Sequence, residues 1–159
     1  MKKLILLLFI PLVSFSQIND QSKLNLENIV KFSDVESAPF YIDWCASNLA
    51  EDGMRECTDS GIKLFAKRNF DTQLANELKL SGFQRITSAF VINKNGNVVD
   101  IRVRAPHPQL EDEAIRVINL LPKMKPGMQI GKAVVVPYSL PINFEVKEEV
   151  YRIEYFNPD

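Results

Sequence analysis

The sequence has few of the residues from which catalytic and metal sites are built. Its 159 residues include one histidine and two cysteines. A site that needs several imidazole or thiolate ligands therefore lacks them, and neither a metal nor another cofactor is predicted. The sequence also lacks a glycine-rich phosphate loop and a Gly-x-Ser-x-Gly nucleophile motif. These absences argue against an enzyme.

An excess of positive charge is missing as well. The chain has 19 Lys and Arg residues against 20 Asp and Glu residues, a formal net charge of −1. Proteins that bind nucleic acids carry a clustered excess of Lys and Arg, so nucleic acid is not a predicted partner. A small basic cluster remains at Lys123, Lys125 and Lys132. We count Lys123 and Lys125 as candidate partner-binding residues, with ordinary solvated loop charge as the alternative.

Long hydrophobic runs are also missing. The longest lies at the N-terminus, where Lys2 and Lys3 precede an apolar run from Leu4 to Val13 and the small residues of Ser14-Phe15-Ser16. This layout predicts a signal peptide over residues 1–16, cleaved before Gln17, and export to the periplasm. The apolar run has about ten residues, whereas a membrane-spanning helix needs about 20. A retained membrane anchor is the alternative; after cleavage, no stable membrane insertion is expected.

Export changes the interpretation of Cys45 and Cys57. In an oxidising compartment two such thiols form a lasting disulfide, which would contribute about 3 kcal/mol by the loop-entropy model. Free or intermolecular thiols are an alternative, and a metal or redox role is a second.

The rest of the chain is predicted to form one domain, preceded by a linker and followed by a C-terminal tail. Residues 17–37 are polar and predict a linker, and residues 38–146 predict a single domain that includes the cysteine-bracketed segment. Residues 147–159 form a tail whose weak alternation predicts a short extra strand.

Within the domain, the apolar period predicts helix, strand, strand, helix and strand. A first helix is expected from about Ile62 to Asn69, with Asp59 or Ser60 as its cap. Period-2 alternation then predicts a hairpin around the turn at residues 93–96. The alternating residues expected on its core face are Ile86, Ser88, Phe90, Ile92, Val99, Ile101 and Val103.

A second helix is expected to begin at Pro108 and to end before Pro122. His107 precedes a proline, so it should lie just outside this helix and help to begin it. The helix presents an apolar stripe of Leu110, Ala114, Val117, Ile118 and Leu121. A last strand is expected to run from Val134 to Val146. The predicted fold is α+β, a three-stranded antiparallel sheet with two helices on one face.

Several motifs occur in a fixed order between Cys57 and Phe144. The most specific are Leu-Pro-Lys-Met-Lys-Pro-Gly at residues 121–127 and Pro-Ile-x-Phe at residues 141–144. Others are Asn69-Phe70, the segment 90–98, His107-Pro108 with the helix that follows, Gly131-Lys132 and Val136-Pro137-Tyr138. With these motifs the stretch resembles the C-terminal domain of TonB-type energy transducers, in the form common in the Bacteroidetes.

The resemblance implies a periplasmic interaction domain without catalytic activity. Domains of this family dock on TonB-dependent outer-membrane receptors by pairing a sheet edge, usually that of the last strand, with an extended receptor segment. Here the predicted linker is much shorter than a transducer's spacer, and the apolar segment has the features of a cleaved signal. A free-standing module that binds envelope proteins is therefore expected; a membrane-anchored transducer is the alternative if the N-terminal segment is retained.

Two prolines bear on this docking edge. Pro137 and Pro141 have the same parity, so both lack a donor on one edge of the last strand. That edge should face outward and keep the backbone N–H groups of Val135, Ser139, Asn143 and Glu145, the candidate partner-binding residues. Protection of an open edge from aggregation is the alternative explanation of the prolines. Self-association through the same edge, giving a homodimer, is an alternative function.

Overall fold

The computed structural model describes residues 28–45 and 49–147. The predicted signal peptide and the predicted extra strand of the tail lie outside these residues. Within the described part, none of the helices combines the length and the hydrophobicity that a membrane crossing requires.

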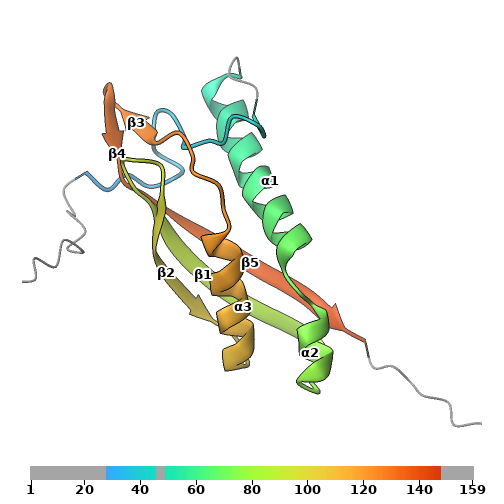
Figure 1. Cartoon of the computed structure of the whole chain (residues 1–159). Helices are drawn as coiled ribbons and strands as arrows, with labels where there is room; N and C mark the ends of the chain where they lie inside the picture. Colours follow the sequence, from blue (N-terminus) through green and yellow to red (C-terminus); the bar gives the residue numbers. More distant parts are fainter. Residues whose placement is uncertain (1–27, 46–48, 148–159) are drawn as a thin grey trace, which may run out of the picture.

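The centre of the fold is a three-stranded antiparallel sheet in the order β2-β1-β5 (Figure 1). Its strands are β1 (Gly82–Ile92), β2 (Val98–Arg104) and β5 (Val136–Val146). The helices are α1 (Glu51–Asn69), α2 (Gln73–Glu77) and α3 (Pro108–Asn119), and a separate hairpin joins β3 (Gly127–Gln129) to β4 (Lys132–Val134). The predicted α+β fold with its three-stranded antiparallel sheet is confirmed.

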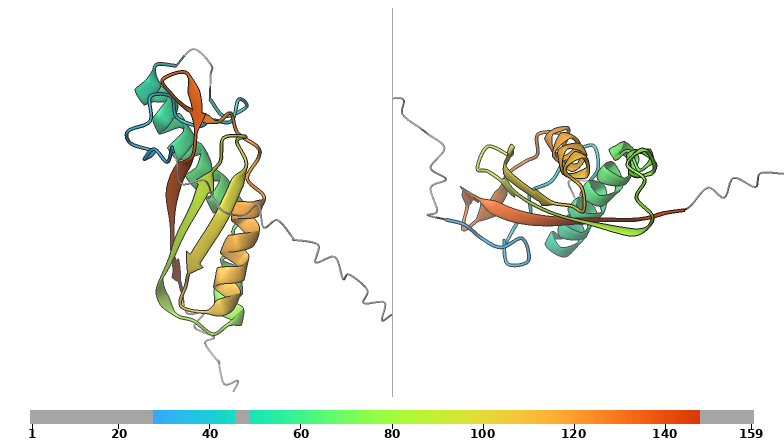
Figure 2. Two further views of the ribbon diagram at one scale, coloured as in Figure 1. Left: turned by 90° about the vertical axis from the view of Figure 1, so that its left-hand side faces the viewer. Right: turned by 90° about the horizontal axis from the view of Figure 1, so that it is seen from below.

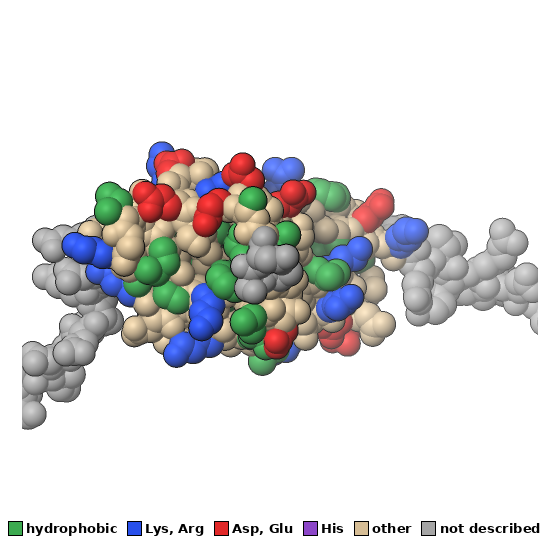
Figure 3. Space-filling model, turned by 90° about the horizontal axis from the view of Figure 1, so that it is seen from above, with side chains coloured by type: hydrophobic (Ala, Val, Ile, Leu, Met, Phe, Trp, Pro, Cys, Tyr) green, Lys and Arg blue, Asp and Glu red, His purple; other side chains and the backbone are tan. Residues whose placement is uncertain are grey.

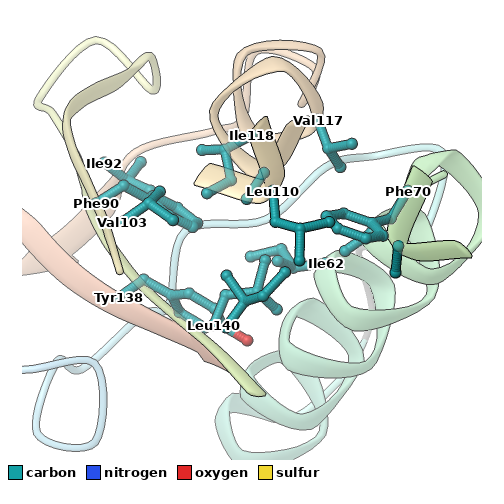
Figure 4. Close-up of a cluster of buried hydrophobic side chains, with 14 of the residues drawn as sticks. Ile62, Phe70, Phe90, Ile92, Val103, Leu110, Val117, Ile118, Tyr138 and Leu140 are labelled. Carbon is teal, nitrogen blue, oxygen red and sulfur yellow. The ribbon is translucent and has the colours of Figure 1, made fainter. Parts of the chain in front are cut away.

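The hydrophobic core lies between one face of the sheet and helices α1 and α3 (Figure 2). In Figure 4, side chains from both helices meet those of β1, β2 and β5. The alternation predicted for β1 is confirmed, since its core-facing positions are 0–1% exposed. The largest fully buried side chains of the cluster are Phe90, Ile62, Ile86, Ile92, Leu110, Ile118 and Leu140.

Helix α1 begins about three turns earlier than predicted, at Glu51 instead of near Ile62. Its first half is mostly polar, with Met54 and the disulfide-bonded Cys57 as exceptions, so a periodic apolar stripe is hard to recognise there. Burial nevertheless repeats every four residues along the helix. Thr58 can occupy one of the buried positions because its hydroxyl donates to the carbonyl of Pro39 at 2.8 Å. The stretch after α1, predicted to be irregular, contains the single-turn helix α2.

Strand β2 departs from simple alternation at Asp100. Ala89 of β1 pairs with Arg102 of β2, and Val91 pairs with Val99. Between these two pairs β1 advances by two residues and β2 by three, so β2 contains one extra residue. Asp100 has φ 50°, a left-handed conformation that aspartate tolerates better than most residues. The extra residue shifts the parity, so Val98 packs against the core instead of the predicted Val99.

Helix α3 begins as predicted. His107 is its N-cap, and its imidazole Nδ1 accepts a hydrogen bond from the backbone N–H of Gln109 at 3.2 Å. Four residues of the predicted stripe are buried, while Leu121 is partly buried just beyond the end of the helix. The role of His107 is thus local and structural.

The loop between β1 and β2 is joined to the segment after α3. Gly96 has φ +80° and donates to Asn93, while its own carbonyl accepts from the backbone N–H of Met124 at 2.9 Å. A Cβ at this position would lie 1.7 Å from the carbonyl oxygen of Met124. Only glycine fits this crossing without movement of the backbone.

The predicted last strand is divided at Val135. Val134 belongs to β4, which pairs with β3, and β5 starts at Val136. The hairpin is covered by residues that were predicted to be a linker. Val35 is fully buried against Val134 and Val136, and Ser37 pairs with Met128. The packed fold therefore starts within residues 28–37 and not at the predicted boundary of residue 38.

The predicted disulfide is present. Cys45 and Cys57 are bonded, with their Cα atoms 5.8 Å apart, and Cys45 is 2% exposed. The bond fixes the segment before α1 to the middle of that helix. Beside it, the ring of Trp44 lies so close to Gly61 that an added Cβ would be 2.5 Å from the ring.

Candidate docking edge

One edge of β5 is paired with β1 along its whole length, and the other faces outward. Residues of one parity in a strand direct both backbone polar groups to the same edge. Val135 shows which parity faces outward, because its N–H and C=O bond to residues 28 and 30 and not to β1. Pro137 and Pro141 share this parity, as predicted, so their missing donors are not needed by the ladder with β1.

The outward edge is partly occupied by the chain itself. The N–H of Val135 donates to the carbonyl of Asn28 at 3.2 Å, and its carbonyl accepts from Val30 at 3.0 Å. This is a parallel bridge, and it corrects the prediction that Val135 is free to bind a partner. The candidate docking edge therefore runs from Pro137 to Glu145. In this stretch Ser139, Asn143 and Glu145 supply the donors.

A groove of about 470 Å³ runs beside this edge. Residues 140–144 of β5 form one wall, and Lys63, Ala66 and Lys67 of α1 form the other, with Phe70 and Thr72 at the end of the helix. The rings of Phe70 and Phe144 pack 5.6 Å apart between their centres. A strand added to the outer edge would therefore find open space next to α1.

Asp59 links α1 to β5 above this groove. Its carboxylate accepts a hydrogen bond from the hydroxyl of Tyr138 at 2.6 Å and another from Lys63 at 2.6 Å. Burial by itself raises the pKa of Asp59, but the hydrogen bonds from Lys63 and Tyr138 and the charge of Lys63 outweigh it and hold the pKa below its usual value. Burial and the adjacent carboxylate raise the pKa of Tyr138 well above its usual range.

This arrangement predicts an acid-sensitive contribution to stability. Because the pKa of Asp59 is lower in the folded state than in the unfolded chain, its contribution is present above the unfolded pKa of about 3.9 and is lost as the pH falls through the folded value. Urea unfolding at pH 6 and at pH 2.5 measures the loss. We expect a smaller loss for Asp59→Asn than for the unaltered protein, and equal losses would contradict the assignment.

The two predicted lysines lie elsewhere. Lys123 and Lys125 are exposed and line a separate hollow of about 190 Å³ with Tyr41, Ile42 and Met124. The backbone of Lys125 is paired with that of Phe40. The structure does not bring these side chains to the groove beside β5, which is lined by Lys63 and Lys67 instead.

Sequence reasoning missed Lys63 and Lys67. Their spacing of four residues, with Ala66 and Phe70 on the buried side, places both at the border of one helical face. That signal was available, but it does not show which strand α1 lies against.

A second exposed surface lies at the upper end of the molecule, around β3 and β4 (Figure 1). Figure 3 shows hydrophobic side chains there, bordered by acidic and basic ones. Ile42 and Ile130 are the most exposed large hydrophobic residues of the β3–β4 end and its surroundings, at 57% and 79%.

Among residues 28–45 and 49–147, no group of three His, Cys, Asp or Glu side chains is placed to hold a metal ion.

Comparison with known families agrees with this architecture. The family model described as "Gram-negative bacterial TonB protein C-terminal" matches residues 73–146, which include the sheet, α3 and the candidate edge. Residues 73–146 belong to the TonB C-terminal family. The lead segment, the disulfide and α1 precede the matched region.

A solved TonB C-terminal domain is also similar to the chain. It is the NMR solution structure of the Helicobacter pylori domain, with 19% identity and a TM-score of 0.40, covering 65% of this chain and 89% of that one. No curated protein matches. Membership of the TonB C-terminal family implies a protein-interaction role in the cell envelope, in a family of non-catalytic domains.

Proposed function

We propose that the domain binds an extended segment of another envelope protein by adding it as a strand to the outer edge of β5. The N-terminal segment of a TonB-dependent outer-membrane receptor is the partner we favour. The observation that carries this proposal is the row of outward backbone groups from Pro137 to Glu145 with a groove beside it. Main-chain hydrogen bonds supply affinity in this mode of recognition, and side-chain pockets supply specificity.

The proposal places the domain in the periplasm, on the basis of its family and the predicted signal peptide. The alternative of a membrane-anchored transducer depends on residues 1–16, which lie outside the described residues. In both cases the same edge would bind the partner.

Backbone donors on the edge can be removed and restored to test the proposal. Asn143→Pro removes one outward donor without touching the ladder to β1, and Asn143→Ala is the matched control that keeps it. We expect Asn143→Pro to bind receptor N-terminal peptides about 3- to 10-fold more weakly, the value of one net hydrogen bond. Pro141→Ala restores a donor and should bind more tightly. Backbone amide shifts during peptide titration of the full chain measure all four proteins.

Two results would contradict strand addition. The first is equal binding by the Asn143→Pro and Asn143→Ala variants. The second is an absence of amide shifts along residues 137–145 at millimolar peptide. A dimer seen by light scattering that Asn143→Pro dissociates, in the absence of peptide binding, would favour self-association through the same edge.

A further inference from the structure

We propose that Lys67 selects partner segments that carry an acidic side chain on the α1 side of the added strand. This inference rests on the proposed function, because it concerns the same edge. It goes further by assigning a specificity-determining residue and a chemical requirement on the partner.

The first step is the direction of the partner's side chains. Residues opposite one another on neighbouring strands direct their side chains to the same face. Leu140 and Ile142 of β5 face the helices, and Leu140 is 1% exposed in the core (Figure 4). Partner residues opposite these two positions therefore direct their side chains into the groove below α1.

The second step is the chemistry of the groove. Its lining is largely apolar and includes Phe70, Ile142 and Phe144, which suits one apolar partner side chain. The charged residues that line it are two lysines, with no aspartate or glutamate. An acidic side chain two positions from the apolar one thus has an electrostatic complement in the groove.

The third step distinguishes the two lysines. Lys63 is already paired with Asp59 at 2.6 Å. Lys67 is exposed and takes part in no ion pair among residues 28–45 and 49–147. Its charge is therefore available to a partner carboxylate, whereas the charge of Lys63 is compensated within the domain.

The neighbouring Arg68 provides a matched control. It lies in the same last turn of α1, where either cation complements the helix dipole. However, Arg68 lines a different hollow with Trp44, Leu64 and Phe65. Lys67→Glu and Arg68→Glu change the net charge and the helix terminus equally, and only the first changes the groove.

The experiment uses two synthetic ten-residue peptides of alternating valine and threonine. One carries a central glutamate in place of a valine, and its twin carries a lysine there. We expect Lys67→Glu in the full chain to bind the glutamate peptide about fivefold more weakly than the unaltered protein does, and to bind the lysine twin more tightly. Arg68→Glu should change neither affinity by more than about twofold.

Several outcomes overturn the inference. Equal effects of Lys67→Glu and Arg68→Glu on peptide affinity would show only a general effect of net charge. If Lys67→Glu does not increase the affinity for the lysine peptide, a direct ion pair with the partner is excluded. Failure of the glutamate peptide to bind the unaltered protein at millimolar concentration would also overturn it. If Asn143→Pro weakens peptide binding while Lys67→Glu does not, the charge selection fails and the proposed function stands. If Asn143→Pro has no effect on a peptide that binds, both fail.

Discussion

Replacing Gly96 with alanine is expected to lower the free energy of unfolding by about 4 kcal/mol. Two costs combine in this substitution. An L-residue at φ +80° is strained, and its Cβ would lie 1.7 Å from the carbonyl oxygen of Met124. Because the atom it meets belongs to the backbone, a change of side-chain rotamer cannot relieve the contact. The segment after α3 would have to move away from the hairpin.

Gly82→Ala separates the two costs. Gly82 has φ +71°, but an added Cβ there meets nothing within 4 Å. It should therefore lose only the conformational cost, about 1–2 kcal/mol. Urea unfolding of both variants gives the comparison. If Gly96→Ala lowers the free energy of unfolding no more than Gly82→Ala does, the backbone contact with Met124 relaxes at little cost and the prediction is wrong.

Removal of the Cys45–Cys57 disulfide is expected to have the second-largest effect, a loss of about 3 kcal/mol. The bond closes a short loop between the lead segment and α1, with a sequence separation of 12. It holds Trp44 near Gly61 and Phe65, whose ring centre is 5.8 Å from that of Trp44. Without the bond, the unfolded chain gains conformational freedom and this packing must hold the segment alone.

Two routes to the same state control for side effects. The double variant Cys45→Ala/Cys57→Ala and the reduced unaltered protein should show similar losses in urea unfolding. A reductant should not change the stability of the double variant. A double variant as stable as the oxidised protein would contradict a structural role of the bond.

Local sequence patterns were enough to predict the sheet, α3 and the outward direction of the proline edge. These elements have strong periodicity, and the rule that proline avoids a paired edge needs only the parity of Pro137 and Pro141. The patterns failed where a long-range contact decides the structure. The bulge at Asp100 depends on the register with β1, and the burial of Val35 depends on a hairpin almost a hundred residues later.

The candidate site shows the same division. Three of the four predicted edge donors, at Ser139, Asn143 and Glu145, lie on the stretch that remains unpaired within the described chain. Val135 does not, because residues 28–30 pair with it. No local signal in the polar segment before residue 38 indicates that pairing. Lys67 likewise becomes relevant only once α1 is placed beside β5.

The parallel bridge at Val135 also has a mechanical consequence. A tension applied to the chain before residue 28 reaches the folded domain first through the two hydrogen bonds between this segment and Val135. The next restraint is Arg55, whose guanidinium holds the carbonyls of Phe32 and Val35. The load thus enters at the start of β5, the strand to whose outer edge we propose that a partner segment binds. A tension from the N-terminal side and a partner strand added to the outer edge would then both act on β5.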